Sequence, residues 1–191
     1  MRRIGIEYLK DVRRRGREFR NTEYLKRQAA EVARFLTEEH DKYGLFICGR
    51  VGNGKSTIVR AIHKIVNDMA SEGAFSKGEI FPWDYMALVD AREMVRTFIR
   101  DYDEEFRLLK SRRYLIIDDL GTDQKDVSLY GTIFNPFMEL LDYRYEKVLP
   151  TIIVSNLTAK NIVEKYGDPR LSDRMNEMFE VLPFEDNSFR V

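Results

Sequence analysis

The sequence predicts an α/β fold in which parallel strands form one sheet between two layers of helices. A glycine-rich run at residues 49–57 stands between an apolar strand and an amphipathic helix. Downstream, short apolar runs alternate with helical patterns as far as residue 182, and such alternation is typical of a parallel sheet. The run 114–118 is apolar up to its last residue, which is typical of a strand covered on both faces.

Apolar residues recurring every three or four positions predict the helices, and short apolar runs predict the strands. The expected helices are 22–39, 55–71, 91–110, 136–147, 159–165 and 170–178. The expected strands are 45–48, one within 84–89, 114–118, 151–154 and 179–182. Asn135-Pro136 predicts a helix start, because asparagine caps a helix and proline fits its first turn. Residues 1–20 are basic and weakly periodic, 73–79 are expected to form a loop, and a polar loop is expected after Gly121.

The run from Gly49 to Thr57 fits the pattern G-x-x-x-x-G-K-[ST], which predicts a phosphate-binding loop. Its candidate nucleotide-binding residues are Gly49, Gly52, Asn53, Gly54, Lys55, Ser56 and Thr57. Backbone N–H groups and the start of the following helix attract phosphate oxygens. Lys55 would contact the β- and γ-phosphates and Ser56 would hold Mg²⁺, so we expect ATP and Mg²⁺ as cofactors. A glycine-rich turn with a surface lysine would not explain the periodicity on either side.

Two acids, Asp118 and Asp119, end the apolar run 114–118. In a parallel α/β sheet, ligands bind beyond the carboxyl ends of the strands, where these acids are expected. Asp118 would complete the magnesium shell, and Asp119 would orient or deprotonate the attacking water. A pair of turn acids before Gly121 is the plainer interpretation of the same residues.

Three further residues are candidates for the chemistry. Asn156 follows the strand 151–154 and could hydrogen-bond the γ-phosphate or the attacking water, although it could also be a turn asparagine. Arg170 and Arg174 are four residues apart on a short helix and project from one face. An arginine placed in trans at a phosphate can accelerate transfer by about 10³–10⁵. The alternative for both arginines is a pair of surface ion pairs.

Composition limits the remaining possibilities. Lys and Arg total 32 and Asp and Glu total 32, so the net charge indicates no partner. Residues 1–27 hold ten Lys/Arg against four Asp/Glu, which is suited to contact with nucleic acid, an acidic protein surface or anionic lipid, or simply to a solvated helix surface. The single cysteine, Cys48, allows no internal disulfide. No signal peptide or membrane span is evident, so a cytoplasmic location is expected.

The segments GRVGNGKST, LIIDDLG, TIIVSNLT, GDPRLSDRM and FEDNSFR, in this order, resemble the ATPase domain of bacterial DnaC-type helicase loaders. The related IstB transposition ATPases share the first three of these motifs. Both families belong to the initiator branch of the AAA+ ATPases. The resemblance covers roughly residues 40–191, so we divide the chain into a basic N-terminal segment with one helix (1–40) and an AAA+ P-loop ATPase domain (41–191).

The resemblance implies a function and a role for each matching residue. Lys55 and Ser56 match phosphate and magnesium ligands, Asp118 the magnesium-shell acid, and Asn156 the sensor-1 residue. Arg174 matches the arginine finger that enters a neighbouring subunit's site, and Arg170 matches the second arginine of that motif. The family's sheet order is 5-1-4-3-2, and no helical lid is expected after the core. The implied protein is an ATPase that assists DNA replication and associates with itself in the ATP state.

One departure from the family leaves an alternative open. Aspartate at 119 is one methylene shorter than the usual glutamate, so hydrolysis could be slow. A nucleotide-gated switch, or an IstB-like partner of a transposase with little turnover, is therefore the alternative. A small-molecule kinase is disfavoured because no arginine-rich lid insertion occurs between the later strands. A GTPase is disfavoured because the sequence has no N-K-x-D motif.

Single-stranded DNA and a replicative helicase or a transposase are the expected partners. Arg92, Arg96 and Arg100 form a basic stripe on the expected helix 91–110, and the resemblance assigns this region to the helix that faces single-stranded DNA. Like charges four residues apart cost about 0.2–0.5 kcal/mol per pair, which a function would explain. The alternative is a solvated face balanced by the acids Asp101, Asp103, Glu104 and Glu105.

Overall fold

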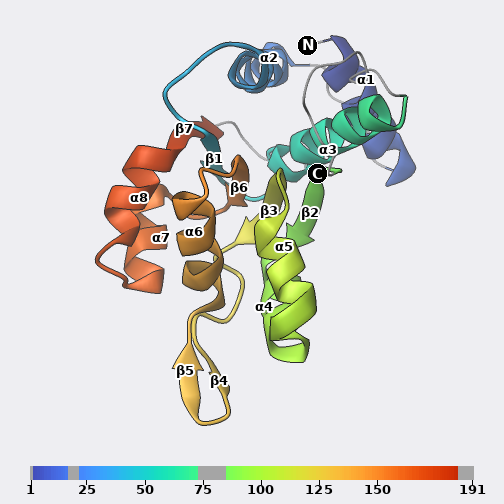
Figure 1. Cartoon of the computed structure of the whole chain (residues 1–191). Coiled ribbons are helices and arrows are strands. Elements are labelled where there is room, and N and C mark those ends of the chain that lie inside the picture. Colours follow the sequence, from blue (N-terminus) through green and yellow to red (C-terminus); the bar gives the residue numbers. More distant parts are fainter. Residues whose placement is uncertain (1, 17–21, 73–84, 185–191) are drawn as a thin grey trace.

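The computed structural model describes residues 2–16, 22–72 and 85–184 and has three layers (Figure 1). Its five-stranded sheet is parallel and has the order β2-β3-β6-β1-β7. The strands are β1 (Gly44–Gly49), β2 (Ala87–Asp90), β3 (Leu115–Leu120), β6 (Thr151–Ser155) and β7 (Phe179–Phe184). Counted along the chain as five, they have the order 5-1-4-3-2, as predicted.

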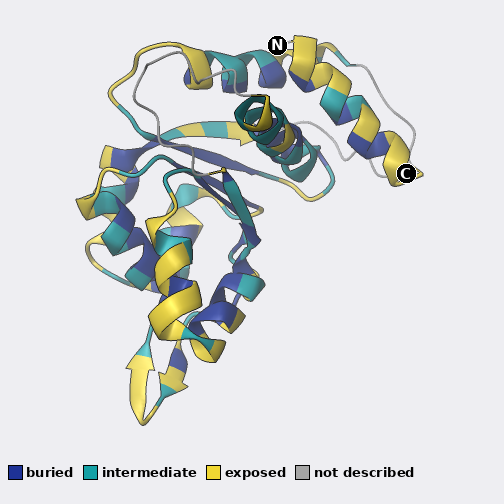
Figure 2. Cartoon of the chain, turned by 45° about the vertical axis from the view of Figure 1, so that its right-hand side comes forward, coloured by how far each residue is buried: buried dark blue, intermediate teal, exposed yellow. Residues whose placement is uncertain are grey.

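Helices cover both faces of the sheet. One face packs against α1 (Arg2–Arg14), α2 (Glu23–Thr37) and α3 (Lys55–Ser71). The other packs against α4 (Ala91–Arg100), a π-helical turn η1 (Tyr102–Phe106), α5 (Arg107–Ser111), α6 (Pro136–Glu146), α7 (Ala159–Tyr166) and α8 (Leu171–Met178). The buried residues of the helices face the sheet and the exposed residues face outward (Figure 2). Among the described residues, no helix combines the length and the apolar content needed to cross a bilayer.

The central strands are apolar at consecutive positions because both of their faces are covered. In β1, Leu45 and Ile47 lie in the core beneath α2 and α3, whereas Phe46 and Cys48 lie in the core on the opposite face. Successive side chains of a strand point to opposite faces of the sheet. Because helices cover both faces, neither set of alternate residues is exposed. The prediction of a doubly covered parallel sheet is confirmed.

The predicted helix start at residue 136 is also confirmed. Asn135 caps α6, its side-chain oxygen accepting from the backbone N–H of Met138 at 3.1 Å, and Pro136 occupies the first turn. Similar caps begin α2 at Thr22 and α7 at Thr158. Each cap pairs a backbone donor that the first turn of a helix leaves unsatisfied.

Two stretches of helix differ from the prediction. Residues 2–14 form α1, whose buried residues Ile4, Tyr8 and Val12 pack in the same core as α3. The predicted helix 91–110 is interrupted at Asp101, where η1 begins. The wider π-turn keeps Phe106 fully buried, with its ring centroid 4.8 Å from that of Phe98. Burial of the aromatic rings therefore overrides the regular helical period.

The predicted polar loop after Gly121 is wrong in part, because it contains a β-hairpin. Strands β4 (Val127–Leu129) and β5 (Thr132–Phe134) are joined by Tyr130-Gly131. Both turn residues have positive φ, 51° and 82°, as a two-residue hairpin turn requires. The hairpin projects from the body of the molecule and exposes Tyr130 fully (Figure 1).

The predicted loop 73–79 and nearly all of the C-terminal FEDNSFR segment lie outside the described residues. The predicted division of the chain at residue 40 stays a prediction. In the structure, α1 and α2 contribute to the same apolar core as β1 and α3.

Candidate nucleotide site

The candidate site lies at the carboxyl ends of β1, β3 and β6. The phosphate loop connects β1 to α3, the two acids end β3, and Asn156 follows β6. Because these strands are neighbours in one parallel sheet, residues more than 60 positions apart in the chain lie together at this edge.

Two of the loop glycines stand where any other residue would be strained. Gly49 has φ 143°, and a Cβ there would lie 2.0 Å from the carbonyl oxygen of Phe184 in β7. Gly54 has φ 93°, and a Cβ there would lie 2.6 Å from the hydroxyl of Tyr8 in α1. Both glycines therefore let the loop turn sharply while neighbouring elements press closely against it.

The side chain of Lys55 is the centre of the loop. It is 4% exposed, and its ammonium donates to the carbonyl oxygens of Gly49 and Arg50 at 2.6 and 2.8 Å. It also donates to the side-chain oxygens of Asn53 and Asn156 at 3.1 and 3.0 Å. Lys55 and Asn156, which the sequence predicted separately, are thus in direct contact.

Asn53 is fully buried and points inward from the loop. Its amide nitrogen donates to the carbonyl oxygen of Phe184 at 2.6 Å, and its oxygen accepts from Lys55. The side chain of this predicted nucleotide ligand therefore fastens the loop to β7. Ser56 and Thr57 are half-buried in the first turn of α3.

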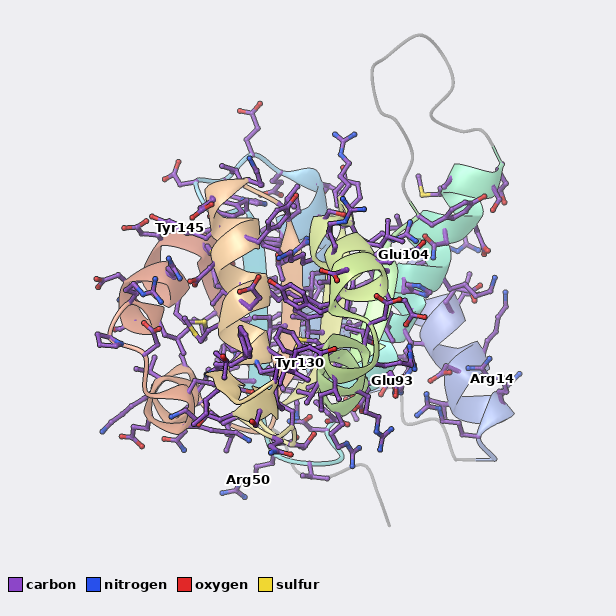
Figure 3. All side chains as sticks on the ribbon, turned by 60° about the horizontal axis from the view of Figure 1, so that its bottom comes forward. Arg14, Arg50, Glu93, Glu104, Tyr130 and Tyr145 are labelled. Carbon is purple, nitrogen blue, oxygen red and sulfur yellow. The ribbon has the colours of Figure 1, made fainter. Side chains whose placement is uncertain are left out.

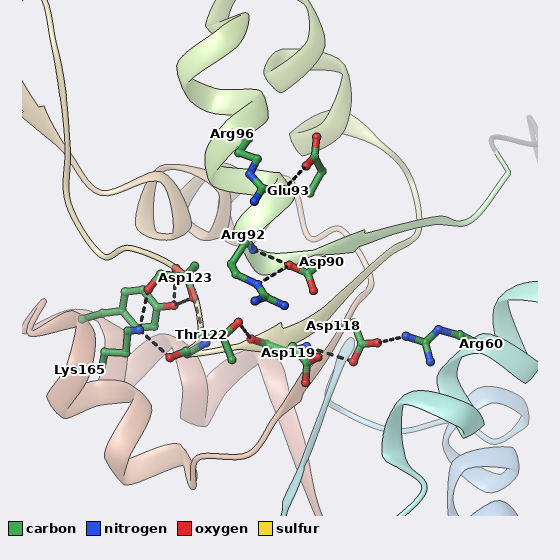
Figure 4. A network of polar contacts seen from close by, with 12 residues as sticks. Arg60, Asp90, Arg92, Glu93, Arg96, Asp118, Asp119, Thr122, Asp123 and Lys165 are labelled. Atoms are coloured by element: carbon green, nitrogen blue, oxygen red, sulfur yellow. Dashed lines mark hydrogen bonds and ion pairs between the residues drawn. The ribbon is translucent and has the colours of Figure 1, made fainter. Parts of the chain in front are cut away.

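Ser56, Asp118 and Arg60 form a polar cluster beside the loop. The Ser56 hydroxyl donates to one oxygen of Asp118 at 2.9 Å. A guanidinium nitrogen of Arg60 donates to the other oxygen at 3.1 Å (Figure 4). Asp118 is buried, and this burial raises the pKa of its carboxyl group. A nearby cation stabilises the charged form of a buried carboxylate. Hydroxyl and carboxylate oxygens are also the ligands that Mg²⁺ prefers.

These oxygens fit a magnesium ion that is shared with a nucleotide. Mg²⁺ is usually held by one or two protein groups together with phosphate oxygens and waters. Within the described ranges, no group of three or more His, Cys, Asp or Glu side chains could hold a metal unaided. The fit therefore depends on phosphate oxygens from a bound ligand.

Asp119 stands in an unusual backbone conformation. Its φ is 57°, in the left-handed region, at a point where the pairing of β3 with β6 shifts register. The irregularity turns Asp119 away from the buried position of Asp118, and Thr122 binds its carbonyl oxygen at 2.9 Å (Figure 4). Aspartate and asparagine tolerate the left-handed region better than longer side chains, which gives a physical reason for aspartate at 119.

The structure separates the two arginines from this cluster. Arg174 lies in α8 and Arg170 directly before it, on the opposite face of the sheet from α3 (Figure 1). Both pair with Asp142 of α6, Arg170 at 3.4 Å. The sequence interpretation as a pair of ion pairs is therefore correct for the isolated chain.

Two residues of the site, Arg60 and Tyr8, and the arginine partner Asp142 were not predicted from the sequence. Arg60 lies one helical turn after Ser56, a spacing that could have indicated it. Tyr8 and Asp142 come from helices far away in the sequence, and no local pattern marks them. Burial raises the pKa of the Tyr8 hydroxyl to about 12, and the neighbouring Asp11 contributes.

No family model matches the chain. No curated protein matches it either. Solved structures do: the crystal structure of the DnaC helicase loader has a TM-score of 0.61 at 18% identity, over 87% of this chain and 93% of that one. A putative primosome component from Streptococcus pyogenes also has a TM-score of 0.61, at 21% identity over 90% of this chain and 84% of that one.

The chain has the fold of the DnaC helicase loader. The three-layer α/β fold predicted from the sequence is thus confirmed, and at these identities the likeness concerns the fold alone. AMPPCP-bound DnaA from Aquifex aeolicus is similar at a TM-score of 0.55 and 22% identity, over 90% of this chain and 50% of that one. The replication initiator DnaA bound to AMPPCP and single-stranded DNA has a TM-score of 0.52 at 17% identity, over 86% of this chain and 47% of that one.

Proposed function

We propose that the protein binds ATP with Mg²⁺ and hydrolyses it as an accessory ATPase of DNA replication, similar in action to a helicase loader. One observation carries the proposal. The buried ammonium of Lys55, the Ser56–Asp118 pair and the amide of Asn156 meet at one sheet edge. This arrangement offers a cation, two magnesium ligands and a neutral hydrogen-bonding group to one triphosphate.

Each of these residues has a distinct task. Lys55 leaves the loop carbonyls and neutralises phosphate oxygens, while Ser56 and Asp118 hold Mg²⁺. Bound Mg²⁺ draws charge from the phosphate oxygens. Asp119 orients the water that attacks the terminal phosphorus and accepts its proton, and the bond to the β-phosphate oxygen breaks, which releases ADP and phosphate. Asn156 contacts Lys55 and loses or gains a phosphate contact as the nucleotide changes.

Completion of the site requires a second copy of the chain. We assign Arg174 and Arg170 to the nucleotide of a neighbouring subunit, and their position on the opposite face of the sheet from α3 supports this assignment. A guanidinium that reaches the terminal phosphate stabilises the charge of the transition state. Hydrolysis therefore depends on self-association in the ATP state.

Single-stranded DNA and a replicative helicase or transposase are the proposed partners. The DNA contact is α4, where Arg92, Arg96 and Arg100 are all exposed. Each is paired with a carboxylate, and the partners are Asp90, Glu93 and Glu105. Exposed ion pairs contribute only about 0–1 kcal/mol, so phosphates can replace these carboxylates at small cost.

The test is the rate of ATP hydrolysis per subunit, measured against protein concentration with and without single-stranded DNA. The wild-type rate is expected to rise with concentration, and DNA is expected to shift the rise to lower concentration. Arg174→Ala should lower the maximal rate by at least about 10³-fold with unchanged ATP affinity, because the arginine acts only on a neighbour's phosphate.

Lys160→Ala is the matched control, since Lys160 is highly exposed on the neighbouring helix α7. A wild-type rate that is independent of concentration, and equal to that of Arg174→Ala, would refute the role in trans. Loss of ATP affinity in Arg174→Ala would also count against it, since that result indicates a contact within one subunit.

A second candidate function is a nucleotide-gated switch with little turnover, and the left-handed aspartate at 119 favours it. Asp119→Glu should then raise the hydrolysis rate at least tenfold, because the longer carboxylate reaches the water better. A small loss of stability, about 1 kcal/mol, is expected from the backbone conformation. A wild-type rate already near 1 s⁻¹, typical of an efficient phosphoryl-transfer enzyme, would exclude the switch.

A further inference from the structure

Arg174, the arginine that the proposed function places in trans, lies on its own subunit in a socket formed by Asp142 and Tyr145 of α6. Arg174 is 12% exposed, although arginine side chains on a helix surface are usually exposed. Its guanidinium forms an ion pair with Asp142 of α6. Its central carbon lies 5.2 Å from the ring centroid of Tyr145, one turn further along α6.

The socket itself is fixed by further contacts. The Tyr145 hydroxyl donates to Glu177 of α8, so α6 and α8 are tied on both sides of the guanidinium. Figure 3 shows Tyr145 at the side of α6 that faces α8. Asp142 and Tyr145 are both half-buried, so the guanidinium is held between a carboxylate and an aromatic face.

Arg170 is held differently at the edge of the same socket. Its side chain is 61% exposed and forms two hydrogen bonds to Asp168, at 2.9 and 3.1 Å. It also approaches the second oxygen of Asp142 at 3.4 Å. Each oxygen of Asp142 thus serves one of the two arginines.

We propose that Asp142 is the positioning residue for Arg174. The proposal rests on the proposed function, in which Arg174 acts on the nucleotide of a neighbouring subunit. Asp142 pairs with one nitrogen of the Arg174 guanidinium and so restricts the orientations that the remaining donors can take. Asp142 acts through the Arg174 guanidinium and is assigned no contact of its own with the nucleotide.

The physical reason is preorganisation. A free arginine side chain has many rotamers, and holding it in one of them opposes binding. The ion pair and the ring contact select one orientation before the neighbour arrives, so less freedom is lost at the phosphate. Because a displacement of about 1 Å can cost about 10²-fold in rate, a guanidinium that is present but misplaced keeps only part of its effect.

The test combines Asp142→Asn and Asp142→Glu with Arg174→Ala, in the full chain. Asp142→Asn should lower the maximal rate per subunit about tenfold and leave ATP affinity within about twofold. Asp142→Glu should recover most of the rate, since it restores the charge. In the Arg174→Ala background, Asp142→Asn should cause no further loss, because the two residues act as one unit.

Tyr145→Leu gives a second route if Asp142→Asn does not fold. It removes the aromatic face, and a rate loss of about threefold that disappears in the Arg174→Ala background is expected. An unchanged rate in Asp142→Asn would overturn the proposal. A raised rate would also overturn it, since Asp142 would then restrain the arginine rather than position it, and so would an equal loss in the Arg174→Ala background.

The two proposals fail in distinguishable ways. If Arg174→Ala hydrolyses ATP like the wild type, the role of Arg174 in trans is wrong and the socket has nothing to position. If Arg174→Ala is slow but Asp142→Asn is fast, the role in trans stands and only the positioning role of Asp142 is wrong.

Discussion

Lys55→Ala is expected to weaken ATP binding at least about 100-fold. The Lys55 ammonium is buried and donates to four oxygens, three in the loop and one on Asn156. These bonds hold it in the proposed phosphate-binding site. Hydrogen bonds to charged groups contribute about 1.5–3 kcal/mol each, and the loss of two such bonds to phosphate corresponds to about 3 kcal/mol or more. Calorimetric titration with a non-hydrolysable ATP analogue measures the affinity.

Lys64→Ala is the control for this variant. Lys64 lies on the same helix, α3, with its side chain 56% exposed and paired only with Asp68 among the described contacts. Its removal should leave the affinity within about twofold. Equal affinities in wild type and Lys55→Ala, in samples that unfold at similar temperatures, would contradict the proposed nucleotide site.

Arg144→Met is expected to cause the largest loss of stability. Arg144 is fully buried, and burial lowers the pKa of its guanidinium to about 9, so it remains cationic at neutral pH. It donates to the carbonyl oxygens of Lys110, Arg112 and Pro150 and to the Thr151 hydroxyl, at 2.7–3.0 Å. These bonds fasten α6 to the end of α5, to the segment after it and to the start of β6.

Methionine fills a similar volume but leaves these buried acceptors without their donor. Each unsatisfied buried group costs about 1–3 kcal/mol, so we expect the free energy of unfolding to fall by about 3 kcal/mol or more. For a chain of this length, that corresponds to a fall in Tm of about 6–12 °C. Calorimetric or circular-dichroism melting measures it.

Two variants bracket this result. Arg144→Lys keeps the charge, but one ammonium cannot reach all four acceptors, so an intermediate loss is expected. Lys147→Met, at the exposed end of the same helix, should change Tm by less than about 2 °C. If the Tm of Arg144→Met also lies within about 2 °C of the wild-type Tm, the buried acceptors must find other hydrogen-bond partners.

The strand order and the phosphate loop could be predicted because their signals are local. The apolar runs and the glycines of 49–54 have fixed spacing, and the fold follows from their alternation with helices. The hairpin 127–134 was missed because its turn, Tyr130-Gly131, is not one of the usual asparagine–glycine pairs. The break at Asp101 was missed because the helical period alone does not report that Phe98 and Phe106 must both be buried.

The sequence predicted which residues form the candidate site, but it did not predict which residues of other elements contact them. Lys55, Ser56, Asp118 and Asn156 were expected at one edge, and the structure brings them together. The partners supplied by other layers, among them Tyr8 at Gly54 and Asp142 at Arg174, depend on how helices pack across the sheet. Such contacts follow from tertiary structure and leave no periodic mark in the sequence.

The packing of Tyr8 against Gly54 connects the first helix to the opening of the phosphate loop. Fluctuations that lift α1 away from α3 would expose Ile58 and Ile62 to water and would remove the hydroxyl that confines Gly54. Amide hydrogens of the first turn of α3 should therefore exchange with solvent in the same opening event as those of α1. A protein shortened by its first sixteen residues would keep the GKS triplet yet hold it in a looser loop.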